Sequence, residues 1–198
     1  MRQIKIKLAK SAGFCFGVKR ALDIALKTAR QNKNVYMLGD IVHNEDVVKQ
    51  IQKAGIKKIK RLEPGKNRIL LIRAHGACQK ILQETLRRGY KIIDATCPMV
   101  KEIHRIVKNM EEKGHKIIVI GDKKHNEVHG IIGQLKGKAI IIDNPRDISL
   151  KKIKDIKRAC VVVQSTQNLD KVLEIVKILK LRIKDLKFFN TICKPTRI

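Results

Sequence analysis

The sequence contains no tryptophan, and aromatic residues make up only 3% of its 198 residues. Because proteins that bind single-stranded nucleic acids stack the bases on aromatic side chains, this scarcity argues against such a binding surface. There is no uninterrupted apolar run of about 18 residues, the length that a membrane-spanning helix requires, and residues 1–5 lack the apolar core of a signal peptide. The sequence therefore predicts a cytoplasmic protein with no membrane partner.

Acidic residues are also few, with 18 Asp and Glu against 45 Lys and Arg, and the formal net charge is +27. Such a charge invites a nucleic-acid interpretation. The lysines, however, are spread over every segment and alternate with isoleucine, as in residues 4–7 and 56–60, which indicates a general role as solvated residues. A basic anion- or nucleic-acid-binding protein without a cofactor is the alternative function, and it predicts strongly salt-dependent binding to any polyanion.

The five cysteines are odd in number, lie far apart and include no Cys-x-x-Cys pair. In a cytoplasmic chain this spacing argues against a disulfide framework and favours metal binding or catalysis by some of them. Two cysteines and two histidines lie outside the patterns described below. We predict that Cys78 and Cys160 are buried thiols that pack as small apolar side chains, and that His104 and His115 are surface residues.

Cys97 lies in a turn between a strand and a helix. Residues 91–93 predict a strand, the turn Asp94-Ala95-Thr96-Cys97-Pro98-Met99 follows, and residues 100–107 have the three- and four-residue apolar spacing of a helix. The dipole at a helix N-terminus favours an anion such as a thiolate, so Cys97 is placed for metal binding or nucleophilic chemistry.

Two further cysteines have a similar context. Cys15 follows an alternating strand pattern at residues 4–9 and precedes a predicted helix, and Cys193 ends a predicted strand at residues 186–192. The recurrence predicts repeats that share one centre.

Strands and helices alternate along the chain, which is typical of a parallel α/β protein. Besides the segments named above, predicted strands cover residues 34–38, 56–62, 68–73, 115–120, 139–142 and 159–163, and predicted helices cover residues 18–31, 45–54, 79–88, 128–134 and 168–179. No Ser-, Pro- or Gly-rich linker separates them. We expect a first α/β lobe with its N-terminal strand at residues 1–96, a second α/β lobe at residues 97–192, and the start of a third lobe at residues 193–198.

Polar clusters follow several of the predicted strands, where parallel sheets bind their ligands. Histidines occupy equivalent positions after three strands, and hydroxyl groups follow a fourth: His43, His75, His125, Ser165 and Thr166. Together they predict a pocket for a phosphate-bearing anion. Glu127, two residues after His125, is the best candidate for delivering a proton.

Three cysteines in equivalent contexts limit the metal that they could bind. A structural zinc site prefers four protein ligands, usually from closely spaced pairs, whereas an iron–sulfur cluster can use three cysteines and leave one iron open as a Lewis acid. We favour the cluster. A zinc-binding structural module stays as an alternative, and it predicts a colourless protein that contains zinc.

Seven short motifs follow one another along nearly the whole chain. They are Gly13-Phe14-Cys15-Phe16-Gly17-Val18, Val42-His43-Asn44, Ala74-His75-Gly76, Asp94-Ala95-Thr96-Cys97-Pro98, His125-x-Glu127-Val128-x-Gly130, Gln164-Ser165-Thr166 and Asn190-Thr191-Ile192-Cys193. In content and order they resemble the motifs of the 4-hydroxy-3-methylbut-2-enyl diphosphate reductases, which catalyse the last step of the non-mevalonate isoprenoid pathway.

The resemblance implies three lobes of parallel sheet with flanking helices around one [4Fe-4S] cluster. It implies reductive removal of the substrate hydroxyl as water, with two electrons from a ferredoxin- or flavodoxin-like donor, to give isopentenyl and dimethylallyl diphosphates. By motif, the cluster ligands would be Cys15, Cys97 and Cys193, and the diphosphate pocket would contain His43, His75 and His125. Glu127 would supply protons, with Ser165 or Thr166 as its hydrogen-bonding partner.

The chain departs from the family pattern at its C-terminus. Family members continue after the third cysteine motif with a further lobe that carries diphosphate-binding residues, whereas this sequence ends at Ile198. We therefore expect a chain that lacks most of the third lobe and whose own activity has to be tested.

Overall fold

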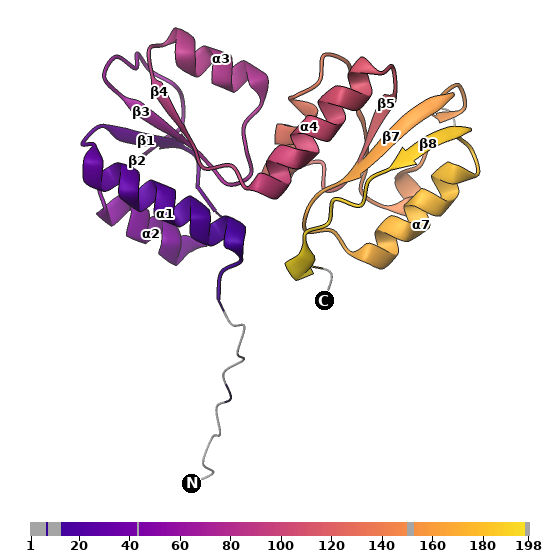
Figure 1. Cartoon of the computed structure of the whole chain (residues 1–198), viewed down its shortest axis with the longest axis horizontal. Coiled ribbons are helices and arrows are strands. Elements are labelled where there is room, and N and C mark those ends of the chain that lie inside the picture. Colours follow the sequence, from indigo (N-terminus) through magenta and orange to yellow (C-terminus); the bar gives the residue numbers. More distant parts are fainter. Residues whose placement is uncertain (1–6, 8–12, 43, 150–152, 197–198) are drawn as a thin grey trace.

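The computed structural model describes residues 7, 13–42, 44–149 and 153–196 of the chain. These residues form two four-stranded sheets with flanking helices (Figure 1). The N-terminal strand predicted at residues 4–9 lies almost entirely outside the described residues, as does His43. None of the helices in the described part of the chain is long and apolar enough to span a lipid bilayer.

The first sheet contains β1 (Val35–Leu38), β2 (Lys57–Ile59), β3 (Ile69–Ile72) and β4 (Lys91–Asp94), in the spatial order β2-β1-β3-β4. All pairings are parallel. The helices α1 (Phe16–Gln31) and α2 (Glu45–Lys53) cover one face, and α3 (Gln79–Arg87) covers the other (Figure 1). The central strand β3 is therefore buried on both faces, which explains why its sequence is uniformly apolar.

The second sheet repeats this arrangement. It contains β5 (Lys116–Ile120), β6 (Ile140–Ile142), β7 (Arg158–Val163) and β8 (Asp185–Phe188) in the order β6-β5-β7-β8, again with parallel pairings. The helices α4 (Pro98–Glu112) and α5 (Asn126–Ile132) pack on one face, and α7 (Leu169–Lys180) packs on the other. Two 3-10 helices, η1 (Pro145–Asp147) and η2 (Lys194–Thr196), complete the described elements.

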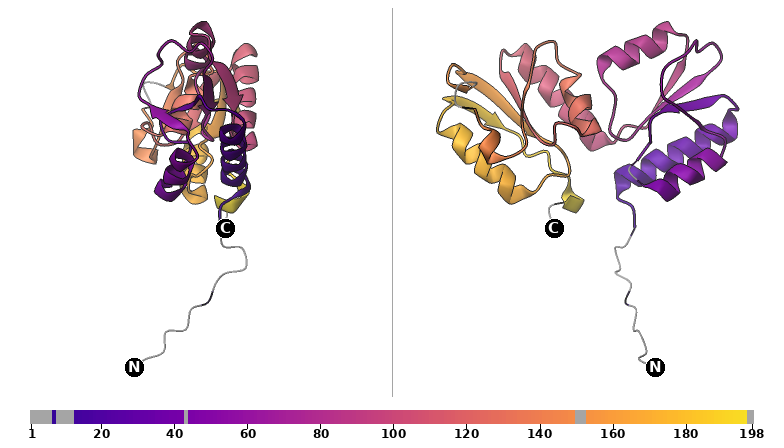
Figure 2. Two further views of the ribbon diagram at one scale, coloured as in Figure 1. Left: turned by 90° about the vertical axis from the view of Figure 1, so that its left-hand side faces the viewer. Right: turned by 180° about the vertical axis from the view of Figure 1, so that it is seen from behind.

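The two sheets confirm the predicted parallel α/β class and the internal repeat. Figures 1 and 2 show α4 between the sheets, so that the loops after the strands of both sheets face the same central region. The lobe boundaries at residues 96/97 and 192/193 stay predictions, as does a third lobe that begins at residue 193.

The last strand is shorter than predicted, because β8 ends at Phe188 and not at Ile192. Beyond it, the side chain of Asn190 accepts a hydrogen bond from the N–H of Ile192 (3.2 Å). The hydroxyl of Thr191 accepts a hydrogen bond from the N–H of Val163 (2.8 Å) and donates one to the carbonyl of the same residue. Side chains thus replace the regular ladder and carry the chain to Cys193.

We predict that Thr191→Val lowers the free energy of unfolding by about 2 kcal/mol, because it removes two buried hydrogen bonds of Val163. Thr28→Val is the matched control. Thr28 and Thr191 are both 7% exposed, but the hydroxyl of Thr28 only bonds to Ile24 within α1, so its loss should cost less than about 1 kcal/mol. Urea unfolding measures both values, and equal losses would contradict this role of Thr191.

Candidate active site

A cavity of about 400 Å³ lies between the two sheets, beside the carboxyl ends of their strands. The side chains that sequence patterns selected line it together: Cys15, Cys97, Cys193, His75, His125, Glu127, Ser165 and Thr166. These residues come from six separate segments of the chain. The predicted pocket histidine His43 lies outside the described residues.

Cys15 and Cys97 are the N-cap residues of α1 and α4. Gly17, in the first turn of α1, leaves room for both sulfurs, because a Cβ atom at this position would lie 2.7 Å from Cys97 Sγ and 4.0 Å from Cys15 Sγ. The two thiols therefore lie close to each other across the lobes. Both are placed where helix N–H groups favour a negatively charged sulfur.

The turn that carries Cys97 is held by contacts to both lobes. The N–H of Cys97 donates to the carbonyl of Ala74 (2.9 Å), and Arg20 Nη1 of α1 donates to the carbonyl of Thr96 (3.0 Å). Asp94 accepts from the N–H of Thr96 (2.9 Å) and pairs with Lys101 (2.6 Å). Burial by itself would raise the pKa of Asp94, but the bonds to Lys101 and Thr96 outweigh it, so the pKa is lowered and the turn keeps a charged anchor.

Cys193 is fixed to the loop that follows β7. Its N–H donates to the carbonyl of Ser165 (2.9 Å), and its Sγ lies 3.1 Å from Thr196 Oγ1 in η2. The third thiol and the hydroxyl of Ser165 thus belong to one hydrogen-bonded unit.

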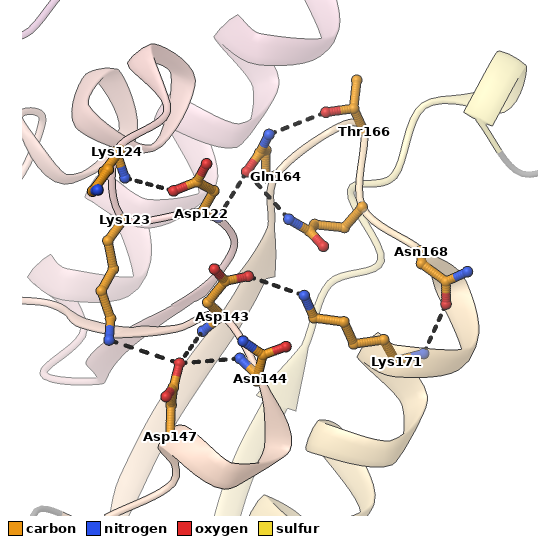
Figure 3. A network of polar contacts seen from close by, with 11 residues as sticks. Asp122, Lys123, Lys124, Asp143, Asn144, Asp147, Gln164, Thr166, Asn168 and Lys171 are labelled. Atoms are coloured by element: carbon orange, nitrogen blue, oxygen red, sulfur yellow. Dashed lines mark hydrogen bonds and ion pairs between the residues drawn. The ribbon is translucent and has the colours of Figure 1, made fainter.

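Glu127 lines the cavity with a buried carboxylate, and 2% of its surface is exposed. Ser165 donates to both of its oxygens, from the backbone N–H to Oε1 (2.6 Å) and from the hydroxyl to Oε2 (2.7 Å). The hydroxyl of Thr166 instead accepts from Gln164 Nε2 (3.1 Å), and Gln164 Oε1 accepts from the N–H of Asp122 (3.0 Å), as Figure 3 shows. Of the two neighbouring hydroxyls, the one that contacts Glu127 belongs to Ser165.

His75 and His125 meet across the two lobes, with ring centroids 5.6 Å apart and planes at 82°. His125 is the N-cap of α5, and its Nδ1 accepts from the N–H of Glu127 (3.1 Å). A neutral His125 ring therefore carries its proton on Nε2 and can donate there. The ring acts as a cap in place of the usual Ser, Thr or Asp, which explains why α5 begins at Asn126, two residues before the predicted start.

Residues 6–198 match the protein family described as "LytB protein". The chain belongs to this family. Two relatives are named 4-hydroxy-3-methylbut-2-enyl diphosphate reductase. That of Clostridioides difficile (strain 630) is 39% identical over 196 residues, which are 98% of this chain and 70% of the relative, and that of Geobacter metallireducens is 35% identical over 195 residues, with 98% and 68% covered.

A solved structure is similar to this chain in fold. It is the structure of (E)-4-hydroxy-3-methyl-but-2-enyl diphosphate reductase, the terminal enzyme of the non-mevalonate pathway. Its TM-score is 0.85 at 35% identity, over 95% of this chain and 68% of that one. The resemblance stated from the seven motifs is thereby confirmed.

The two cysteines predicted to be buried thiols, Cys78 and Cys160, differ in burial. Cys160 is fully buried in β7, as predicted, and burial raises the pKa of its thiol to about 12. The prediction was wrong for Cys78, which is only partly buried and is the N-cap of α3. Cys78 contacts Gly133 of the other lobe, which is far away in the sequence. Local sequence patterns do not indicate such a contact, and the prediction therefore failed.

Neither of the two histidines predicted at the surface is exposed: His115 is buried and His104 is partly buried. The side chain of His115 is fully enclosed, and burial, together with Arg158, lowers its pKa although Asp185 lies 3.7 Å away. His104 packs between the lobes, where a Cβ atom at Gly76 would lie 2.7 Å from its Cε1. Val100, one helical turn earlier, belongs to the buried face of α4, and this spacing was the available signal for His104.

His104 generates a prediction about stability and pH. Burial lowers its pKa from 6.5 to about 4, Lys108 acts in the same direction, and Asp94 opposes both. Between pH 4 and 6.5, His104 is therefore protonated in the unfolded chain and largely neutral in the folded chain. As the pH falls from 6.5 to 4, His104 should lower the free energy of unfolding by about 3 kcal/mol.

Urea unfolding of the His104→Gln variant over this pH range should lack that part of the decrease. His129→Gln is the control, because His129 is an exposed histidine of the neighbouring helix α5. Parallel pH profiles of the wild type and His104→Gln would show that His104 titrates equally in the folded and unfolded states.

Proposed function

We propose that this chain is an iron–sulfur oxidoreductase that converts 4-hydroxy-3-methylbut-2-enyl diphosphate into isopentenyl and dimethylallyl diphosphates. The reaction breaks the allylic C–O bond, consumes two electrons and two protons, and releases the hydroxyl as water. The observation that carries the proposal is the buried Glu127, held by Ser165 in a cavity that three cysteines and two histidines also line.

In this proposal Cys15, Cys97 and Cys193 hold a [4Fe-4S] cluster. In the described part of the chain, no three His, Cys, Asp or Glu side chains lie close enough to hold a single metal ion. Three thiols spread around one cavity suit a larger group, in which each cysteine binds a different iron, and Gly17 leaves space for it beside two of the sulfurs. The bound cluster would supply electrons and one open iron as a Lewis acid.

His43, His75 and His125 would bind the diphosphate of the substrate. Hydrogen bonds from imidazole N–H groups to phosphate oxygens are charge-assisted and stronger than neutral ones. Support comes from the two described histidines, which line the cavity and lie in edge-to-face contact there, and from the bond between His125 Nδ1 and the N–H of Glu127, which fixes the orientation of the ring. The part of His43 rests on its sequence motif.

Glu127 would deliver the proton to the leaving hydroxyl. Its burial keeps bulk water from competing for that proton, and the two bonds from Ser165 fix both oxygens. We assign Ser165 as the hydrogen-bonding partner of Glu127. Thr166, which is held by Gln164 and lines the cavity, would direct its hydroxyl to the substrate and is the third residue of the catalytic group.

The electrons would come from a small acidic protein of the ferredoxin or flavodoxin type. The net charge of +27 favours association with such a donor through long-range attraction. This partner is inferred from charge and from the reaction.

The cluster assignment predicts that Cys97→Ser loses most of its bound iron and sulfide after anaerobic reconstitution, because serine is a poor ligand for this cluster. Cys160→Ala is the matched control, since Cys160 is a cysteine of the core outside the cavity. Iron and sulfide analysis with an absorption spectrum measures both. Equal metal content in wild type and Cys97→Ser, or zinc in place of iron, would reject the assignment.

The proton role predicts that Glu127→Gln keeps the cluster but lowers turnover of the diphosphate substrate by about 100-fold or more, because the amide keeps the shape and cannot donate an acidic proton. Glu112→Gln, at the exposed far end of α4, should leave turnover unchanged. A cluster-loaded wild-type chain that forms no isopentenyl or dimethylallyl diphosphate would contradict the proposed activity, and an active Glu127→Gln variant would contradict the proton role alone.

A further inference from the structure

The two lobes are joined by a contact between the start of α3 and the end of α5. The N–H of Gln79, the first residue of α3, donates to the carbonyl of Gly133, which directly follows α5 (3.0 Å). The first N–H groups and the last carbonyls of a helix have no partner within it. Here each lobe supplies the group that the helix of the other lobe lacks.

The side chain of Gln134 completes this contact. Its Nε2 donates to the carbonyl of Gly130 at the end of α5 (2.9 Å) and to the carbonyl of Ala77 in the other lobe (2.9 Å). Its Oε1 accepts from Gln79 Nε2 (2.8 Å). Gln134 is 7% exposed, so one buried amide uses both donors and its acceptor to connect the lobes.

Two glycines allow the backbones to approach this closely. A Cβ atom at Gly133 would lie 2.1 Å from the Cβ of Cys78, and one at Gly130 would lie 3.0 Å from the carbonyl oxygen of His75. Any side chain at Gly133 would therefore push α5 away from α3. The interface fits only one relative position of the two lobes.

That position bears directly on the cavity. Ala77 lies two residues after His75, and α5 carries Glu127 in its first turn behind the His125 cap. The edge-to-face contact of the two rings, 5.6 Å between centroids, forms between the same two segments.

We propose that Gln134, with Gln79 as its partner, is a positioning residue that sets the spacing of the phosphate-binding histidines His75 and His125. This inference rests on the proposed function, which makes these histidines ligands of the diphosphate. Gln134 touches neither substrate nor cluster. It acts by holding α5 against the segment that follows His75.

Removing the Gln134 amide leaves the carbonyls of Ala77 and Gly130 and the amide of Gln79 without their partner in a partly buried interface. Such groups recover hydrogen bonds only if water enters and the segments separate. The distance between the His75 and His125 rings then changes, although both rings have to reach one diphosphate. We expect the chain to stay folded and to bind diphosphate more weakly.

The test measures the dissociation constant of inorganic diphosphate by titration calorimetry on the cluster-reconstituted chain. Gln134→Leu should weaken binding by about tenfold, the effect of losing one hydrogen bond to a charged group. Thr85→Val is its matched control, because Thr85 is a fully buried residue of α3 whose hydroxyl bonds within that helix. It should keep wild-type affinity.

Gln79→Met supplies a second variant if Gln134→Leu does not fold. It removes one bond of a partly buried residue and should weaken binding severalfold, whereas Gln83→Met, one turn later and exposed on α3, should not. The positioning role would be overturned if Gln134→Leu and Gln79→Met bound diphosphate with the same dissociation constants as their control variants.

His125→Ala separates this inference from the proposed function. If His125→Ala binds diphosphate as tightly as the wild type, the proposed phosphate pocket is wrong and the positioning role falls with it. If His125→Ala weakens binding but the glutamine variants do not, the pocket stands and only the positioning role is rejected.

Discussion

All strands of both sheets are parallel, and this constraint governs where the chemistry of the molecule can lie. Parallel strands bring their carboxyl ends, and the N-termini of the helices that follow, to one edge of a sheet. Three residues of the cavity are therefore N-caps, namely Cys15, Cys97 and His125. The direction of the strands is therefore enough to gather these functional groups at one place.

The cavity belongs to neither lobe alone, and its shape depends on how two independent cores meet. Each sheet has its own apolar clusters on both faces, so neither core determines the relative position of the lobes. That position is set by polar and steric features: the N–H of Cys97 bound to the carbonyl of Ala74, the glutamine pair, and glycines at the closest approaches. Hydrogen bonds are directional whereas apolar packing is not, so they are suited to fix a distance between two rigid bodies.

The sequence predicted the α/β class and most elements to within a few residues, because β3 is uniformly apolar, β7 is apolar after Arg158, and the helices between strands have clear periodicity. The site residues that it selected and that the structure describes all line the cavity. It did not predict the end of β8, the burial of His104 or the position of Cys78. For β8 and Cys78 the deciding contact is made with a segment far along the chain, such as Thr191 with Val163, and local patterns carry no information about it. For His104 the four-residue spacing from Val100 was a local signal. The choice between Ser165 and Thr166 needed the side-chain directions.

Cys160 shows how the same residue type serves two purposes in one small protein. At neutral pH a thiol with a pKa of about 12 is almost wholly protonated, and alkylating reagents and oxidants react with the thiolate. The core of the second sheet therefore contains a sulfur that is chemically silent, although three other thiols of the same chain line the cavity. Oxidants should therefore react with the more accessible cavity cysteines long before they reach Cys160, so chemical damage to the cavity and loss of the fold are separate events.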